Sequence, residues 1–222
     1  MTNKNKLSAT VFGATGLVGK QIVEALKQDD NYSKVYLPNR REVDFMGDKV
    51  ENLKLEFDKL ENYPELFKVD HLFIAIGTTI KKAGSKTQFQ KVDLEYPMAI
   101  AELAKQYGTK SVLLISSVGA NPKAANFYLK TKGQLEERLA EILGNKVYFV
   151  RPSMLLGKRK EFRFAEEAGK ALLKIMGFLM FGSLRKYRGI YAKEVAAAMI
   201  HIAKEQPKQR LFESDELKSL IK

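Results

Sequence analysis

Short apolar runs and longer amphipathic stretches alternate along the chain as far as about Val150. The apolar runs predict a first strand that ends at Phe12 and further strands at Lys34–Leu37, Val50–Phe57, His71–Ile76, Ser111–Ile115 and Lys146–Val150. Between these runs, apolar residues recur at helical spacing over Leu17–Lys27, Lys86–Tyr107 and Asn126–Leu143. Pro97 is expected to kink the second of these helices. The alternation of strands and helices predicts an α/β fold with a doubly wound parallel sheet.

The pattern changes after about Gly157. Glu161–Leu184 is expected to be helical and partly apolar, and Ala192–Lys204 has the spacing of an amphipathic helix. This part is too short to form an independent domain. We therefore expect one domain over residues 1–222, in which residues 157–222 form a small helical cap on the substrate side of the sheet.

Three glycines at three-residue spacing, Gly13, Gly16 and Gly19, connect the first predicted strand to the first predicted helix. In a dinucleotide-binding turn the first glycine permits the tight turn, the second lets the backbone approach the pyrophosphate, and the third allows close helix–strand packing. The helix N-terminus adds free N–H groups and the positive end of its dipole. The pattern predicts a Rossmann fold, with an ordinary glycine-rich turn as the alternative. The cofactor contacts expected here are Gly13, Thr15, Gly16, Leu17 and Val18.

Two arginines, Arg40 and Arg41, follow the second predicted strand, where the adenosine ribose of a dinucleotide would lie. An acid at this place would bind the 2′-hydroxyl of NAD, whereas guanidinium groups suit a 2′-phosphate. The pair favours NADP(H) over NAD, and a solvated basic turn is the alternative. Asp58 closes the third predicted strand and could accept a hydrogen bond from the adenine amino group or cap the next helix.

Small and polar residues follow the remaining strands at the carboxyl edge of the predicted sheet. Open α/β sheets bind ligands at this edge. The further cofactor contacts expected here are Ile76, Gly77, Thr78, Ser116 and Pro152.

A tyrosine and a lysine four residues apart, Tyr128 and Lys132, lie on one face of the helix after the fifth strand. Hydride transfer to a carbonyl carbon requires a proton for the carbonyl oxygen, and a tyrosine hydroxyl can donate it. Lys132 would favour the phenolate form of Tyr128 and could also hold the nicotinamide ribose. Ser117 is preferred to Ser116 as the serine that orients the substrate, because strand alternation lets only one of them face the site. A half-buried tyrosine beside a surface lysine is the structural alternative.

The composition limits the other functional classes. The chain has a formal net charge of +12 and no cysteine, so neither a disulfide nor a thiolate metal site can form. His71 and His201 lack acidic residues at ligand spacing, so we expect both to be structural and expect no metal site. The basic residues are spread along the chain without a nucleic-acid-binding motif, so no nucleic-acid partner is expected.

Two expectations concern location. The short polar segment Met1–Lys6 lacks the apolar run of a signal peptide, so a cytoplasmic protein is expected. Over Lys158–Arg188, basic residues flank apolar ones, which could contact an anionic membrane peripherally or hold an amphiphilic substrate. A cap helix with a basic rim is the favoured interpretation of this segment.

The motifs together resemble the atypical short-chain dehydrogenase/reductase family. The run Gly77-Thr78-Thr79, Val92-Asp93 and Ser116-Ser117 is similar to the Tat-interacting-protein-like oxidoreductases. The resemblance implies NADP(H) binding and a Ser/Tyr/Lys active site, but no particular substrate. We therefore expect an NADP(H)-dependent oxidoreductase that reduces a small carbonyl compound or oxidises an alcohol. The alternative is a non-catalytic NADP(H)-binding regulator that acts through a protein partner.

Overall fold

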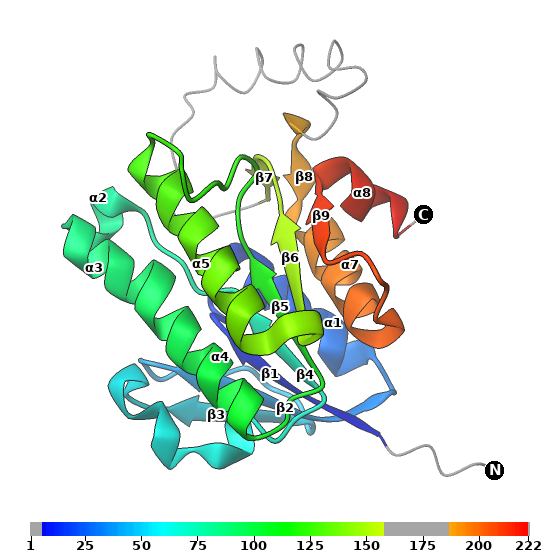
Figure 1. Ribbon diagram of the computed structural model, residues 1–222. Helices are drawn as coiled ribbons and strands as arrows, with labels where there is room; N and C mark the ends of the chain where they lie inside the picture. The colour runs from blue at the N-terminus through cyan, green and yellow to red at the C-terminus, as the bar shows by residue number, and fades with distance from the viewer. Residues whose placement is uncertain (1–5, 158–186, 222) are drawn as a thin grey trace.

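A seven-stranded parallel sheet forms the centre of the protein. The computed structural model describes residues 6–157 and 187–221 (Figure 1). The strand order is β3-β2-β1-β4-β5-β6-β9, and every neighbouring pair is parallel. The strands are β1 (Leu7–Phe12), β2 (Tyr32–Asn39), β3 (Val50–Lys54), β4 (His71–Ile74), β5 (Ser111–Ile115), β6 (Val147–Arg151) and β9 (Leu211–Glu213). This arrangement confirms the predicted doubly wound α/β fold.

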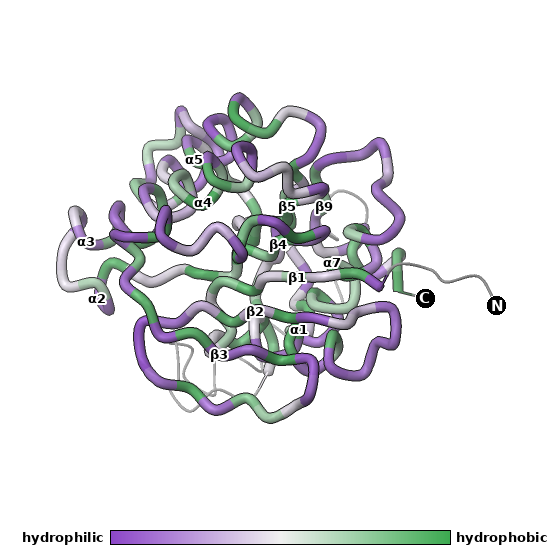
Figure 2. The backbone as a smooth tube through the Cα atoms, turned by 90° about the horizontal axis from the view of Figure 1, so that it is seen from below, coloured by the Kyte–Doolittle hydropathy of each residue, from purple (hydrophilic) through white to green (hydrophobic). Residues whose placement is uncertain are grey.

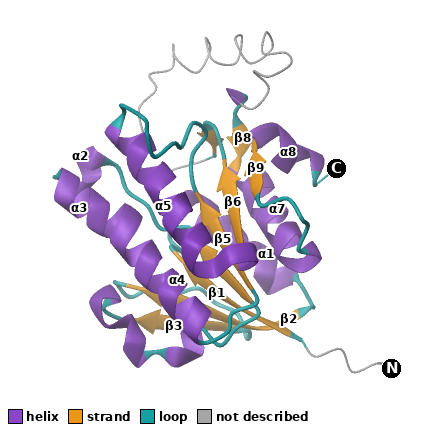
Figure 3. Ribbon diagram, viewed as in Figure 1, coloured by secondary structure: helices purple, strands orange, loops and turns teal. Residues whose placement is uncertain are grey.

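Helices cover both faces of the sheet, as Figures 1 and 3 show. The helices are α1 (Leu17–Gln28), α2 (Ile80–Ala83), α3 (Lys86–Gln90), α4 (Tyr96–Gln106), α5 (Phe127–Leu143), α7 (Ala192–Glu205) and α8 (Ser214–Ser219). One apolar core lies between the sheet and α1 with α7, and a second lies between the sheet and α4 with α5. The central strands β4 and β5 are largely apolar and buried on both faces, which is typical of parallel sheets, whereas the edge strand β3 is polar in part and half-buried. Figure 2 shows the hydrophobic strands inside and hydrophilic loops at the periphery.

The sheet has its topological switch point between β1 and β4. The strands β1 and β4 are neighbours in the sheet, but α1 packs on one face and α4 on the other. The loops that leave these two strands therefore separate at the carboxyl edge and leave a crevice, which is where open α/β sheets bind ligands.

The long helix predicted over Lys86–Tyr107 is interrupted. The structure has α3, then a π-helical turn over Lys91–Glu95, and then α4. The Tyr96 N–H bonds to the carbonyl of Lys91, five residues earlier. Pro97, in the first turn of α4, has no N–H to continue the ordinary pattern. The break thus lies at the predicted proline but takes the form of an extra residue in the turn before it.

Part of the expected C-terminal cap belongs to the main fold. Helix α7 packs against α1 on the face of the sheet, and β9 adds a seventh strand beside β6. The side chains of Val195, Met199 and Phe212 are fully or almost fully buried in the same core as α1. Apolar burial against the sheet thus places these elements in the helix layer and the sheet. The predicted helix Glu161–Leu184 and most of the basic stretch Lys158–Arg188 lie outside the described residues.

Two smaller elements complete the described structure. The short strands β7 (Leu155–Leu156) and β8 (Ile190–Tyr191) pair in parallel beyond the end of β6. Across 6–157 and 187–221, none of the helices combines the length and apolar character that a membrane crossing requires.

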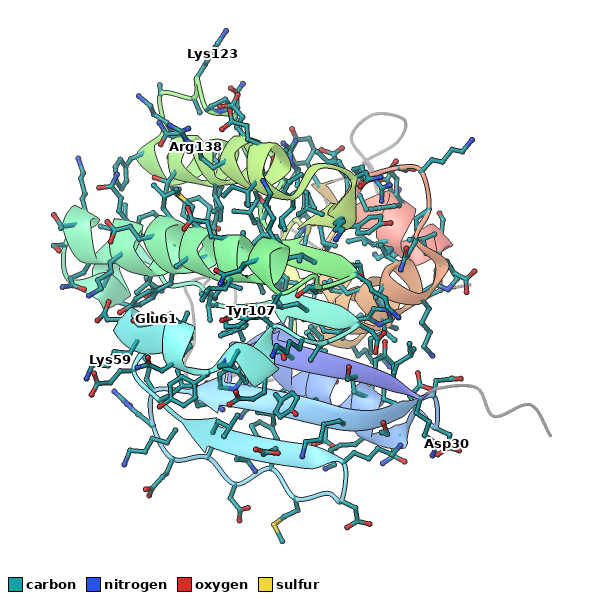
Figure 4. All side chains as sticks on the ribbon, turned by 60° about the horizontal axis from the view of Figure 1, so that its bottom comes forward. Asp30, Lys59, Glu61, Tyr107, Lys123 and Arg138 are labelled. Atoms are coloured by element: carbon teal, nitrogen blue, oxygen red, sulfur yellow. The ribbon has the colours of Figure 1, made fainter. Side chains whose placement is uncertain are left out.

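Charged side chains are dispersed over the described surface. Figure 4 shows Lys59 and Glu61 on the 3₁₀ helix Phe57–Asn62, with Lys123 before α5 and Arg138 on α5. Many of these charges pair locally, as Arg138 does with Glu141 at 3.3 Å. The absence of a nucleic-acid partner stays a prediction.

Candidate functional site

A cavity of about 640 Å³ opens at the carboxyl edge of the sheet. It brings together residues from the loops after β1, β2 and β4, three segments that are far apart in sequence. Of the predicted cofactor contacts, it is lined by Gly13, Thr15, Gly16, Arg40, Arg41, Ile76, Gly77 and Thr78. The glycine turn, the arginine pair and the small residues after β4 therefore share one site.

The glycine positions of the turn are crowded by backbone. Gly13 has φ +89°, and a Cβ built on it would lie 2.6 Å from the backbone of Ala75 at the end of β4. A Cβ on Gly16 would lie 3.1 Å from the Gly13 carbonyl oxygen, which already accepts the Gly16 N–H at 2.9 Å. Only glycine fits at Gly13, because both the positive φ and the close approach exclude a larger residue.

The N-terminus of α1 faces this turn. Gly16 is the residue before the helix, and no side chain caps its first N–H groups. Leu17 and Val18 form the first helical turn, and the side chain of Val18 is buried in the core. Their contribution to a ligand would therefore come from backbone N–H groups, which attract an anion together with the helix dipole.

Arg40 and Arg41 are exposed at the mouth of the cavity, directly after β2. The residue before them, Asn39, is buried and donates its side-chain N–H to the Leu37 carbonyl at 2.8 Å. Glu42, which also lines the cavity, pairs with Lys54 at 3.2 Å. The two guanidinium groups give this end of the cavity a positive potential that suits a phosphate.

Asp58 does not cap a helix. The third strand ends at Lys54, and Asp58 lies inside a 3₁₀ helix, Phe57–Asn62, that Glu56 precedes. The helix-capping alternative is therefore wrong. The Asp58 carboxylate is exposed and pairs with Lys91 at 2.9 Å. Its neighbour Phe57 lines the cavity, and the adenine contact of Asp58 stays a prediction.

Helix α5 carries the predicted acid–base pair. Asn126 caps this helix by accepting the Leu129 N–H at 3.1 Å, so Tyr128 and Lys132 follow within its first turns. The Lys132 Nζ atom is 6.0 Å from the centre of the Tyr128 ring. Tyr128 is half-buried and Lys132 is 4% exposed. The lysine is therefore buried, and the alternative of a surface lysine beside the tyrosine does not describe it.

Lys132 has a partner that the sequence interpretation assigned no role. Its Nζ lies 2.7 Å from Oδ1 of Asp93, whose other oxygen accepts the Thr78 N–H at 2.7 Å. Asp93 comes from the π-helical turn before α4 and is 1% exposed. Asp93 belongs to the run that resembles a known family, but no local pattern indicates its contacts with Lys132 and Thr78, because these partners lie on other elements.

The two serines after β5 differ in their surroundings. Ser116 is 5% exposed, and its Oγ has no hydrogen-bond partner within the part of the chain that the structure describes. Ser117 is half-buried and donates its hydroxyl to the Val118 carbonyl at 3.3 Å. Pro152 is buried, and its carbonyl accepts the Val118 N–H at 3.2 Å. These residues, like Tyr128 and Lys132, are not among the residues that line the cavity.

Several cavity residues had no prediction. They come from the end of β2 and the loop after it, from the 3₁₀ helix and from the segment α2 to α4, and they include Pro38, Val43, Phe57, Lys82, Gln88, Val92 and Tyr96. Phe57 and Tyr96 pack edge to face with ring centres 5.4 Å apart. Phe57 lies in a predicted strand and Tyr96 in a predicted helix, and only the folded arrangement shows that both border the cavity.

Comparison with known proteins agrees with this geometry. The model of the NAD dependent epimerase/dehydratase family matches residues 9–213. The chain belongs to this family. A protein of *Debaryomyces hansenii* named FMP52, mitochondrial, is 32% identical over 206 residues, which cover 90% of this chain and 88% of the relative. The protein HTATIP2 of *Rattus norvegicus* is 35% identical over 170 residues, covering 75% and 69% of the two chains.

Solved structures support the fold. MoeE5 in complex with UDP-glucuronic acid and NAD superposes with a TM-score of 0.70 at 15% identity, covering 96% of this chain and 80% of that one. At this identity the likeness shows the Rossmann fold alone. Family membership together with the glycine turn supports the binding of NAD or NADP.

The relatives correct one expectation. Four fungal FMP52 relatives are named as mitochondrial proteins. The prediction of a cytoplasmic protein is contradicted by these names. Its basis, the lack of a secretory signal pattern in Met1–Lys6, bears on secretion and does not distinguish the cytoplasm from an organelle.

Proposed function

We propose that this protein is an NADP(H)-dependent oxidoreductase that interconverts a small carbonyl compound and its alcohol. The observation that carries the proposal is the single cavity that joins the glycine turn to Arg40 and Arg41. A dinucleotide needs both ends of such a site, one for its pyrophosphate and one for its adenosine. The arginine pair favours a 2′-phosphate at the second end.

The residues present fit the cofactor. A Cβ at Gly13 would clash with the Ala75 backbone and one at Gly16 would press on the Gly13 carbonyl, so the backbone of the turn stays open to a ligand. The start of α1, which no side chain caps, offers N–H groups to an anion. Gly13, Thr15, Gly16 and the first turn of α1 would hold the pyrophosphate. Arg40 and Arg41 would hold the 2′-phosphate, and Ile76 to Thr78 would border the ribose and the diphosphate.

When bound, the nicotinamide supplies a hydride to the substrate or accepts one from it. In the direction of carbonyl reduction, Tyr128 would donate its hydroxyl proton to the carbonyl oxygen, which completes the alcohol. Lys132 would stabilise the tyrosine phenolate that remains and would hold the ribose. Ser117 would orient the substrate oxygen by a hydrogen bond.

The first test is a side-by-side titration of the purified protein with NADPH and NADH, followed by nicotinamide fluorescence. The chain has no tryptophan, so its own emission interferes little. We expect NADPH to bind at least about tenfold more tightly, a difference of roughly 1.4 kcal/mol. Equal affinities would contradict the NADP assignment, and no binding of either would contradict the proposal.

The second test is Tyr128→Phe in a screen of small carbonyl compounds with NADPH. We expect the variant to lose at least about 100-fold in turnover, because the proton donor is gone, with NADPH binding preserved. Tyr107→Phe is the matched control, since Tyr107 lies at the end of α4 and packs on Phe67. Binding of NADPH without turnover by the unmodified protein would contradict the catalytic role and indicate a cofactor-binding regulator.

A further inference from the structure

One phenylalanine is buried outside the two apolar cores. Phe89 of helix α3 is 0% exposed, yet it belongs neither to the core beside α1 and α7 nor to the core beside α4 and α5. Each of the other buried phenylalanines in the described parts of the chain belongs to one of these cores. The packing of Phe89 therefore does not serve the sheet, and its contacts indicate what it holds in place.

Phe89 packs on the first two residues of helix α5. Its ring centre lies 5.8 Å from that of Phe127, at an interplanar angle of 53°, and 5.8 Å from that of Tyr128, at 47°. Tilted rings at these distances attract one another. Figure 1 shows α3 beside the start of α5. A fully buried ring thus lies against the tyrosine that is the proposed proton donor.

The same short helix borders the cofactor cavity. Gln88, the residue before Phe89, lines the cavity together with Lys82 and Ala83 from α2. Ser85 caps α3 by accepting the Gln88 N–H at 3.1 Å, and such a cap stabilises the start of a helix. The segment from α2 to α3 therefore lies between the cofactor cavity and the start of α5.

Few other contacts hold the Tyr128 ring. Within the described residues, the Tyr128 hydroxyl makes no hydrogen bond to the protein. Lys132 Nζ lies 6.0 Å from the ring centre and is itself paired with Asp93. A tyrosine whose hydroxyl is not held takes its orientation from the groups that pack on its ring. Phe89 is the fully buried group of this kind.

We propose that Phe89 is a positioning residue that holds the Tyr128 ring in the orientation that proton transfer requires. The proposal rests on the proposed function. A proton donor must lie within hydrogen-bond reach of the substrate oxygen, about 2.6–3.2 Å. A misplacement of about 1 Å can cost about 100-fold in rate. Phe89 acts through Tyr128, because it packs on the tyrosine ring and does not line the cavity.

Two variants and one matched control test the proposal. Phe89→Leu removes the ring but keeps an apolar side chain at the buried position. Phe89→Met, whose longer side chain fills more of the space, takes its place if Phe89→Leu does not fold. The control is Phe212→Leu, because Phe212 in β9 is 2% exposed and belongs to the core on the face of the sheet opposite α5. It removes a buried ring of the same kind far from Tyr128.

The first experiment needs neither cofactor nor substrate. Peptide mapping after treatment with a tyrosine-nitrating reagent reports the reactivity of individual tyrosines. We expect Tyr128 to react at least about threefold faster in Phe89→Leu, because the space that the ring leaves lets the tyrosine side chain move. Tyr191, which is 52% exposed, is the internal reference, and Phe212→Leu should leave the Tyr128 rate unchanged. An unchanged rate in a folded Phe89→Leu protein would overturn the proposal.

Kinetics with one carbonyl substrate then separate positioning from general structural support. We expect Phe89→Leu to lower kcat at least about tenfold while the KM for NADPH changes less than about threefold. In a Tyr128→Phe protein, the same substitution should lower the residual kcat less than about twofold, because the group that Phe89 positions is gone. Phe212→Leu should leave kcat unchanged. An equal loss in both backgrounds, or no loss in the unmodified one, would contradict the positioning role.

The outcomes keep the two proposals apart. If the unmodified protein turns over no carbonyl, the proposed function fails, whereas the nitration rates still test whether Phe89 holds Tyr128. If Tyr128→Phe loses turnover and Phe89→Leu does not, the proposed function stands and the positioning role fails.

Discussion

Gly19 of helix α1 lies so close to Gly13 that a Cβ on Gly19 would be 2.1 Å from the Gly13 carbonyl oxygen. The third glycine of the turn thus brings the first helix against the end of β1. This close approach sets the position of the α1 N-terminus relative to the cavity. A side chain at Gly19 should therefore affect both stability and cofactor binding.

Gly19→Ala tests this contact. At an open helix position alanine would be favoured over glycine by about 0.5–1 kcal/mol. At Gly19 we expect the opposite, a loss of about 1–3 kcal/mol in the free energy of unfolding, because the methyl group pushes α1 from the turn. Chemical denaturation and an NADPH titration measure the two effects. Lys20→Ala, an exposed neighbour, should stay within about 0.5 kcal/mol. A Gly19→Ala protein as stable as the unmodified one would show that α1 can shift freely.

Arg40→Ala and Arg41→Ala test the choice of cofactor. Hydrogen bonds to charged groups contribute about 1.5–3 kcal/mol, so the loss of a phosphate contact should weaken NADPH binding about 10- to 100-fold. NADH lacks the 2′-phosphate, so its affinity should not change. Arg138→Ala on the outer surface of α5 is the control. If the arginine variants weaken NADH as strongly as NADPH, their role is not recognition of the 2′-phosphate.

Ser117→Ala and Ser116→Ala decide which serine orients the substrate. The Ser117 hydroxyl is at a half-buried position, whereas Ser116 is 5% exposed. We expect Ser117→Ala to lower kcat at least about 100-fold, as the loss of a hydrogen-bond donor at a reacting oxygen does, and Ser116→Ala to lower it less than about tenfold. Steady-state kinetics with one carbonyl substrate give the answer, and the reverse order would assign the role to Ser116.

The buried pair of His71 and Tyr32 predicts a dependence of stability on pH. The Tyr32 hydroxyl lies 2.6 Å from His71 Nδ1, and burial lowers the pKa of His71 from 6.5 to about 4. Between these pH values the unfolded chain binds a proton at this histidine and the folded protein does not. The free energy of unfolding should therefore fall by roughly 3 kcal/mol as the pH drops from about 6.5 to about 4.

Denaturation curves over this pH range measure the effect. His71→Gln, which keeps an acceptor for Tyr32 but cannot titrate, should remove most of the decline, and His201→Gln, at an exposed position, should not.

Two carboxylates, Asp29 and Asp70, change the free energy of unfolding at a lower pH than His71 does. Burial raises the pKa of Asp29 and Asp70, but hydrogen bonds from Lys204 and Asn31 to Asp29, and from Lys110 and Ser8 to Asp70, together outweigh this and hold each pKa below its usual 3.8. Their contributions are lost only below about pH 4, so a decline of equal size in His71→Gln would contradict the assignment.

Much of the site follows from the sequence because its signals are local. The spacing of Gly13, Gly16 and Gly19 needs only a strand before it and a helix after it. The arginines follow β2 directly, so any parallel sheet of this order places them at the same edge as the glycine turn. Gly13, Gly16 and both arginines line one cavity with Gly77 and Thr78, whereas Gly19 packs behind the turn, and the cofactor contacts themselves stay predictions.

The predictions that differ from the structure concern contacts over long distances in the chain. The helix-capping alternative for Asp58 is wrong because the third strand ends early and a 3₁₀ helix takes its place. Helix α7 and β9 belong to the main fold because their apolar side chains pack on α1 and β6, which no local pattern indicates.

The sequence by itself determined the alternation of strands and helices as far as β6, the glycine turn and the arginine pair, since periodicity and turn chemistry depend on near neighbours. Only the tertiary structure decided that Lys132 is buried against Asp93 and that Asp93 holds Thr78. These contacts depend on one extra residue in a π-helical turn and on how two helices and a strand end pack together. The relative positions of these helices and this strand end are set by packing of the whole core, so the local sequence does not reveal them.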